Sequence, residues 1–117
     1  MILVDTSVWV DHLRRGNDEL RRLLIDEQVL CQPFVVGELA CGQLTDRAEI
    51  LTRLQALPQA SCVEHQEALA FLEMHRLAGT GLGWVDVNVL ASAALSGASL
   101  WTFDRSLMKA ARKLGLS

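Results

Sequence analysis

The stretch Ile2-Leu3-Val4-Asp5-Thr6-Ser7-Val8-Trp9 opens the chain with an apolar run that ends on a carboxylate. Consecutive Ile, Leu and Val residues favour a strand. Because the run does not alternate with polar residues, both faces of that strand should be covered, as in a parallel sheet. Asp5 is then carried to the rim of the core. Asp5, Thr6 and Ser7 are all good helix N-caps, so a helix should begin here and run through Leu13.

The rest of the chain continues this alternation of short apolar strands and longer helices. A second helix is expected around Leu20, followed by strands at 29–31, 61–63 and 99–103, and by helices at 34–41, 48–57, 66–77, 84–95 and 105–114. Strands that alternate with helices indicate an α/β fold, in which a parallel sheet is flanked by helices on both faces.

Length and composition suit one compact domain over residues 1–117, with 50% hydrophobic and 21% charged residues. No apolar run approaches the ~20 residues of a membrane-spanning helix, and no basic segment precedes the first apolar run. We therefore expect a cytoplasmic protein. The net charge of −3 is unlike that of a general nucleic-acid binder. An RNA substrate would require a local basic face or a bound cation.

The three cysteines, Cys31, Cys41 and Cys62, are widely spaced and flanked by apolar residues. We interpret them as reduced core residues. No Cys–His spacing resembles a zinc site.

Four acids stand alone in apolar segments: Asp5, Glu38, Asp86 and Asp104. Asp5 and Asp104 follow predicted strands, and Asp86 lies in the first turn of a predicted helix. The carboxyl ends of parallel strands line the ligand crevice of open α/β sheets, so these acids should meet there. An ionised carboxylate in an apolar setting is costly unless a partner compensates it.

Each acid also has a purely structural interpretation. Asp5, Asp86 and Asp104 could simply cap helices, and Glu38 could pair with a buried arginine. One shared explanation is a divalent cation, because Mg²⁺ and Mn²⁺ prefer oxygen ligands and a bound water becomes a better nucleophile.

The pattern resembles the PIN-domain ribonucleases, and among them the VapC toxins of type II toxin–antitoxin modules. The resemblance covers essentially the whole chain. It rests on Ile2–Trp9, Val36–Leu39, Gly83–Ser92 and Leu100–Leu107, and above all on four acids in order with a Thr-x-Asp after a strand.

The resemblance implies a PIN-like three-layer sandwich and a metal-dependent endoribonuclease. Asp5, Glu38, Asp86 and Asp104 would form the catalytic acidic pocket that holds Mg²⁺ or Mn²⁺. We expect Asp5, Asp86 and Asp104 to bind the metal, with Glu38 in the second shell or polarising the attacking water. Ser7 and Thr102, and to a lesser degree Thr6, would orient ligands or water. The implied partners are the RNA substrate, a VapB-type antitoxin and a second copy in a homodimer. Phe103 departs from the pattern, because arginine is frequent in the middle of the Thr-x-Asp motif.

The final predicted helix offers an RNA contact. Arg105, Lys109 and Arg112 share one helical face, which is either a solvated surface or a phosphate-binding one. The three tryptophans, Trp9, Trp84 and Trp101, lie in apolar segments that favour packing over base stacking.

Rival functions have weaker support. A receiver domain needs an adjacent acid pair, and an Asp-x-Asp phosphatase needs an acid where Ser7 stands. The serious alternative is a non-catalytic PIN-like module that binds RNA or a protein.

Overall fold

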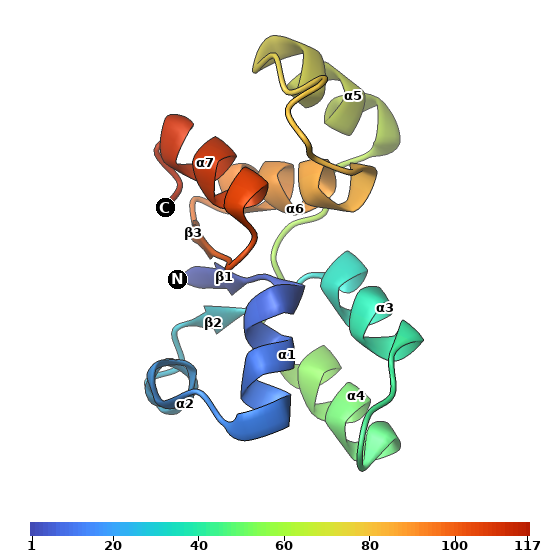
Figure 1. The fold of residues 1–117 in the computed structure, drawn as a ribbon, viewed down its shortest axis with the longest axis vertical. Helices are drawn as coiled ribbons and strands as arrows, with labels where there is room; N and C mark the ends of the chain where they lie inside the picture. The colour runs from blue at the N-terminus through green and yellow to red at the C-terminus, as the bar shows by residue number, and fades with distance from the viewer.

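The computed structural model describes all residues from 1 to 117 and contains three strands and seven helices (Figure 1). In chain order these elements are β1 (Ile2–Val4), α1 (Thr6–Arg15), α2 (Asp18–Ile25), β2 (Val29–Leu30), α3 (Pro33–Cys41), α4 (Arg47–Ala56), α5 (His65–Met74), α6 (Trp84–Leu95), β3 (Ser99–Trp101) and α7 (Arg105–Lys113).

The sheet is parallel throughout and has the order β2-β1-β3, so the opening strand lies at its centre. Leu3 and Val4 are fully buried, which explains why this run shows no polar alternation. In the register of the sheet, Leu3 is opposite Leu30 on one side and Leu100 on the other. The predicted parallel α/β fold is confirmed.

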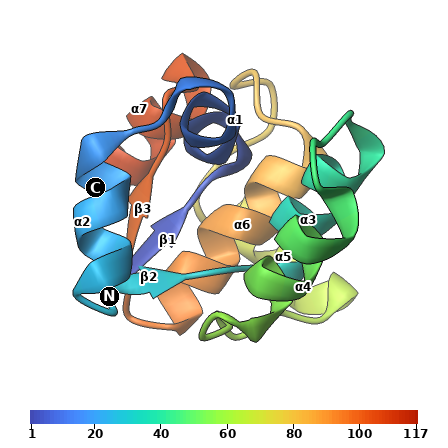
Figure 2. The same ribbon diagram turned by 90° about the horizontal axis from the view of Figure 1, so that it is seen from below.

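Helices cover the sheet on two sides. The connection from β1 to β2 carries α1 and α2, and the connection from β2 back across β1 to β3 carries α3 to α6. The two connections run in opposite directions, so right-handed crossovers place them on opposite faces. Figure 2 shows α2 on one side of the strands and α6 on the other. None of these helices is long and apolar enough to cross a membrane.

The strand predicted at 61–63 is wrong. Instead, Gln59, two residues before the predicted strand, forms a single parallel bridge with Cys31, the residue after β2. The Cys31 N–H donates to the Pro58 carbonyl at 2.9 Å, and the Ala60 N–H donates to the Cys31 carbonyl at 2.7 Å. Ser61 and Cys62 are exposed, so no burial extends the pairing. The other predicted elements are present, with ends displaced by a few residues.

The cysteines are free, as predicted, but the prediction that all three are core residues is wrong. Only Cys31 is buried, while Cys41 and Cys62 are exposed. Cys31 follows β2 toward the sheet interior, whereas Cys41 ends α3 and Cys62 lies in a loop. Burial raises the pKa of the Cys31 thiol to about 11. A hydrogen bond from the Gln32 backbone lowers this pKa, but by less than burial raises it.

We expect two of the three thiols to react with a maleimide in the native protein at pH 7.5. Cys31 should stay unmodified because its thiolate is both buried and disfavoured. Mass spectrometry of the labelled peptides checks this prediction, and labelling in denaturant should reach all three. Rapid native labelling of Cys31 would contradict the packing around β2.

Candidate active site

Asp5 lies at the carboxyl end of the central strand and is buried, with 6% of its surface exposed. Its backbone N–H donates to the Trp101 carbonyl at 2.9 Å, which joins the ends of β1 and β3. Its Oδ2 accepts two hydroxyl hydrogen bonds, from Thr102 at 2.7 Å and from Ser7 at 3.0 Å. No protein group donates to the other carboxylate oxygen, so Asp5 has one oxygen free for a ligand.

The interpretation of Asp5 as a helix cap is wrong. Asp5 occupies the N-cap position of α1, but its side chain makes no capping hydrogen bond. The carboxylate turns instead toward the loop after β3, where Thr102 is buried. A buried carboxylate in this orientation does not stabilise α1. Helix capping therefore does not explain why an aspartate stands at this position.

The same two hydroxyls organise the loop that leads to Asp104. Ser7 Oγ accepts the Phe103 N–H at 3.0 Å, and Thr102 Oγ1 accepts the Asp104 N–H at 3.0 Å. The two hydroxyl oxygens lie 3.3 Å apart. Ser7 and Thr102 thus fix Asp5 and the backbone before Asp104 relative to each other. Their role in orienting ligands or water stays a prediction.

Asp86 and Asp104 approach the same edge of the sheet from the helices that follow. Each makes a capping interaction as well: Asp86 Oδ2 accepts the Gly83 N–H at 3.0 Å, and Asp104 Oδ1 accepts the Leu107 N–H at 2.9 Å. Burial raises the pKa of Asp86, and the negative charges of Asp5 and Asp104 raise it further. Three carboxylates therefore lie close enough to repel one another. We call Asp5, Asp86 and Asp104 the acid cluster.

Glu38 is presented by a different element, α3. It is exposed on α3, so the expectation that it occupies an apolar setting is wrong, and Asp104 is exposed as well. No arginine pairs with Glu38. Its Oε1 instead accepts a 2.6 Å hydrogen bond from Thr6 Oγ1 in the first turn of α1. Apolar neighbours in sequence did not predict burial of Glu38, because the flanking Val, Gly, Leu and Ala residues lie on other faces of the same helix.

No cation balances these carboxylates. The ion pairs of the protein are Arg15–Asp11, Arg21–Asp18 and Arg53–Glu49, and none involves Glu38 or the acid cluster. Uncompensated carboxylates at the end of a parallel sheet are a donor set that fits Mg²⁺ or Mn²⁺.

No group of three acids, histidines or cysteines is close enough to ligate one ion directly. The fit is therefore to an ion held by one or two carboxylates, with water between it and the others. This arrangement is usual for Mg²⁺.

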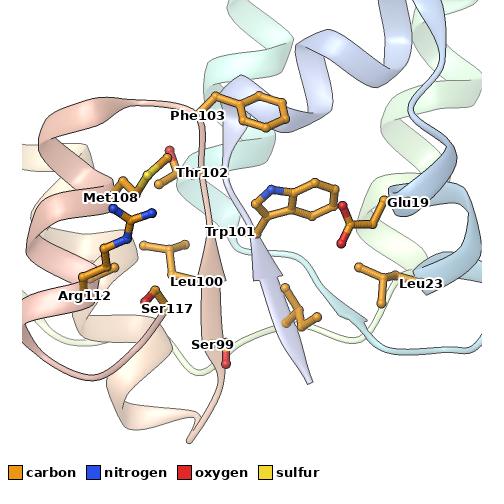
Figure 3. A pocket seen from close by; sticks show the side chains of 12 residues that line it. Glu19, Leu23, Ser99, Leu100, Trp101, Thr102, Phe103, Met108, Arg112 and Ser117 are labelled. Atoms are coloured by element: carbon orange, nitrogen blue, oxygen red, sulfur yellow. The ribbon is translucent and has the colours of Figure 1, made fainter.

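A separate hollow of about 470 Å³ lies on the α2 side of the sheet, where α2, β3 and α7 supply most of its lining (Figure 3). It is lined by Trp101, Met108 and Arg112 among others, and it contains no member of the acid cluster. The basic face of α7 is exposed at Arg105, Lys109 and Arg112, as predicted. Trp9 is in the core, whereas Trp84 and Trp101 are only partly covered.

Gln32 is a positioning residue that sequence reasoning missed. It is almost fully buried directly after β2, and its Oε1 accepts the Phe34 N–H at 2.6 Å at the start of α3. Its Nε2 donates to Ser92 Oγ at 3.2 Å in α6. Gln32 thereby joins the helix of Glu38 to the helix of Asp86. The sequence did contain a signal for Gln32, because it is a polar residue directly after the predicted strand at 29–31, as Asp5 is after the first strand.

Comparison with known proteins gives consistent matches. The family model described as PIN domain matches residues 2–113. Ribonuclease VapC32 of Mycobacterium tuberculosis is 46% identical over 118 residues, covering 100% of this chain and 95% of that protein. Ribonuclease VapC11 of the same species is 27% identical over 107 residues, covering 81% of this chain and 79% of the relative.

Two solved structures share the fold. FitAcB from Neisseria gonorrhoeae superposes with a TM-score of 0.61 at 22% identity, covering 96% of this chain and 94% of the other. PAE2754 from Pyrobaculum aerophilum gives a TM-score of 0.61 at 18% identity, covering 93% of this chain and 78% of the other.

We expect Asp86→Asn to stabilise the metal-free protein at neutral pH. The pKa of Asp86 is raised in the folded state, so the wild type loses stability as the pH rises through that raised value. Asparagine keeps the oxygen that accepts the Gly83 N–H and removes the charge. In EDTA, the melting temperature at pH 7 should rise by roughly 2–5 °C.

The pH dependence provides the internal control. Below the ordinary Asp value of 3.8, the wild-type carboxyl is protonated in both folded and unfolded states, so the gain should vanish. A melting temperature at pH 7 that is unchanged or lowered by Asp86→Asn would contradict the mutual repulsion.

Proposed function

This chain belongs to the PIN-domain family, and from that membership we propose that its acid cluster holds a divalent metal ion for RNA hydrolysis. The chain is an endoribonuclease of the VapC type, a toxin of a toxin–antitoxin module. The observation that carries the metal site is the meeting of Asp5, Asp86 and Asp104 at one edge of the sheet with no basic partner. Without a neutralising cation, the carboxylates of such a cluster repel one another and their pKa values rise, so a bound cation stabilises it.

Asp5 and Asp104 are the proposed direct ligands, and Asp86 binds through water, because no three acids are close enough to ligate one ion directly. Asp5 keeps one oxygen that accepts no protein hydrogen bond, and Asp86 and Asp104 each use a single oxygen for capping. When bound, a Mg²⁺ or Mn²⁺ ion supplies a more acidic water and neutralises charge on the scissile phosphate.

Glu38 is proposed to accept a proton from the attacking water. Glu38 is exposed on α3, which carries no member of the acid cluster. Thr6 donates a 2.6 Å hydrogen bond to one of its oxygens, and the other oxygen is free. Ser7 and Thr102 are proposed to position Asp5. Both hydroxyls donate to Oδ2, so they hold the carboxylate in one orientation and leave its other oxygen free for the metal.

RNA contact by the α7 face of Arg105, Lys109 and Arg112 stays a prediction. All three side chains are exposed, and none forms an ion pair with a carboxylate. Cations without internal partners are available to phosphates, and their attraction would offset the acidic net charge near the site.

The proposed partners follow from the VapC relationship. They are a VapB-type antitoxin that silences the toxin, and a second copy of the chain in a homodimer. We propose that the whole of residues 1–117 acts as one domain. We place it in the cytoplasm, where the RNA and the antitoxin would be.

We expect Asp5→Asn to reduce RNA cleavage by at least about a hundredfold while leaving the fold intact, because it removes a ligand charge without removing volume. EDTA should stop wild-type cleavage, and added Mg²⁺ or Mn²⁺ should restore it. Cleavage of labelled RNA is measured alongside circular dichroism. Asp26→Asn, at an exposed aspartate outside the acid cluster, is the matched control. Cleavage that survives both EDTA and Asp5→Asn would refute the metal mechanism.

We expect Thr102→Val to weaken metal binding by about 10- to 100-fold, because this isosteric change leaves Asp5 without its 2.7 Å hydroxyl donor. Calorimetric titration of Mn²⁺ into the protein provides the measurement, and no RNA is needed. The same titration separates the enzyme from a non-catalytic PIN-like module, since a module without a metal site would give no binding heat even as wild type.

A further inference from the structure

A second hollow, of about 440 Å³, is lined in part by Ser7, which lies two residues after Asp5 of the acid cluster and hydrogen-bonds to its carboxylate. We call it the Ser7–Phe103 hollow. Its lining residues are Ser7, Val10, Asp11, Arg14, Arg15 and Phe103. Ser7 donates to the Asp5 carboxylate at 3.0 Å, so a molecule lying in this hollow would be one side chain away from the proposed metal site.

Phe103 presents an aromatic ring at the rim of this hollow. Its side chain is 47% exposed, and its backbone is held by the 3.0 Å hydrogen bond from its N–H to Ser7. The ring meets Trp101 in an edge-to-face contact, with centroids 5.9 Å apart and an interplanar angle of 84°. Figure 3 shows the Phe103 ring beyond the Trp101 ring at the end of β3, with Arg112 on the other side of the strand. The ring thus contacts Trp101 and is partly exposed to solvent.

Arg14 is the free cation of the hollow. The other arginine, Arg15, is paired with Asp11 at 2.6 Å, whereas Arg14 forms no ion pair. Ser7, Val10 and Arg14 fall at i, i+3 and i+7 and share one face of α1. Arg14 therefore lies about 10 Å along the helix axis from Ser7. It also lines the groove that contains Thr6 and Glu38, so it borders the site on two sides.

We propose that Phe103 stacks on an unpaired base of the substrate next to the cut, and that Arg14 binds a neighbouring phosphate. A partly exposed aromatic ring next in sequence to Asp104, with an unpaired guanidinium further along one face of α1, matches the alternation of bases and phosphates in single-stranded nucleic acid. A base inside a duplex has both faces covered and cannot stack on Phe103. Phe103 and Arg14 are therefore assigned as residues that favour substrates with an unpaired base next to the cut.

This inference rests on the proposed ribonuclease function, so binding is measured separately from cleavage. The protein carries Asp5→Asn in every binding experiment, which keeps the RNA intact. The probe is a fluorescein-labelled single-stranded RNA of mixed sequence, and the readout is its fluorescence anisotropy. A perfectly paired duplex of the same sequence is the comparison ligand, and it should bind more weakly than the single strand.

Phe103→Ala should weaken single-strand binding by about 5- to 150-fold, the loss that follows from removing one base–aromatic stack. Phe103→Trp should restore binding, because a larger ring stacks at least as well. Phe34→Ala is the matched control, since Phe34 is 43% exposed at the start of α3 and lines neither hollow. The inference is overturned if Phe103→Ala binds like its parent, or if Phe34→Ala loses as much.

Arg14→Gln should weaken binding and lower the slope of log affinity against log salt concentration by about 0.7, the value for one phosphate contact on a single strand. Arg76→Gln, at another exposed arginine without an ion pair, should leave the slope unchanged. Equal slopes for the parent and Arg14→Gln would remove Arg14 from the RNA path.

The outcomes also separate this inference from the proposed function. If wild-type protein with Mn²⁺ cuts no RNA, the proposed function fails and the stacking role fails with it. If wild-type protein cuts RNA but Phe103→Ala cuts it with an unchanged KM, the function stands and the stacking role is wrong.

Discussion

The two hydroxyl hydrogen bonds to the Asp5 carboxylate are the contacts on which the site depends. They come from opposite ends of the chain, Ser7 on α1 and Thr102 after β3, and both reach the same oxygen. The hydroxyl oxygens in turn accept the backbone N–H groups of Phe103 and Asp104. A single buried carboxylate therefore sets the path of the loop that carries the next acid and the exposed ring. The packing of the central strand between β2 and β3 makes this possible.

The acid cluster is a site of stored electrostatic repulsion. Burial and neighbouring negative charges disfavour the ionised form of Asp86, and no lysine or arginine relieves them. A structural role would normally bring such a partner, because an unpaired charge in a partly buried place lowers stability. At the proposed metal site this loss of stability has a counterpart, because a bound cation relieves the repulsion between the carboxylates and the relief adds to the free energy of metal binding. The capping bonds of Asp86 and Asp104 keep these two carboxylates in place without neutralising them.

Helix α1 links the acids to the surroundings that a substrate would meet. Its first turn supplies Thr6 to Glu38 and Ser7 to Asp5, and two turns later it presents Arg14. The helix begins at the end of the central strand, so its register is fixed by the sheet. Residues that hold the acids and residues proposed to hold RNA consequently keep constant spacing along one rigid element.

The sequence by itself determined the parallel α/β fold, since unbroken apolar runs ending on polar residues already specify buried strands and a functional edge. It also predicted that Asp5, Asp86 and Asp104 lie near one another, because strand ends and helix starts meet at that edge.

Only the tertiary structure decided that Glu38 is exposed and tied to Thr6, that two of the three cysteines face solvent, and that 61–63 forms no strand. Only the fold also decided that Asp5 makes no cap and that Gln32 joins two helices. These features depend on which face of a helix turns toward which neighbour. Local apolar composition does not encode that choice, because residues adjacent in sequence point in different directions around a helix.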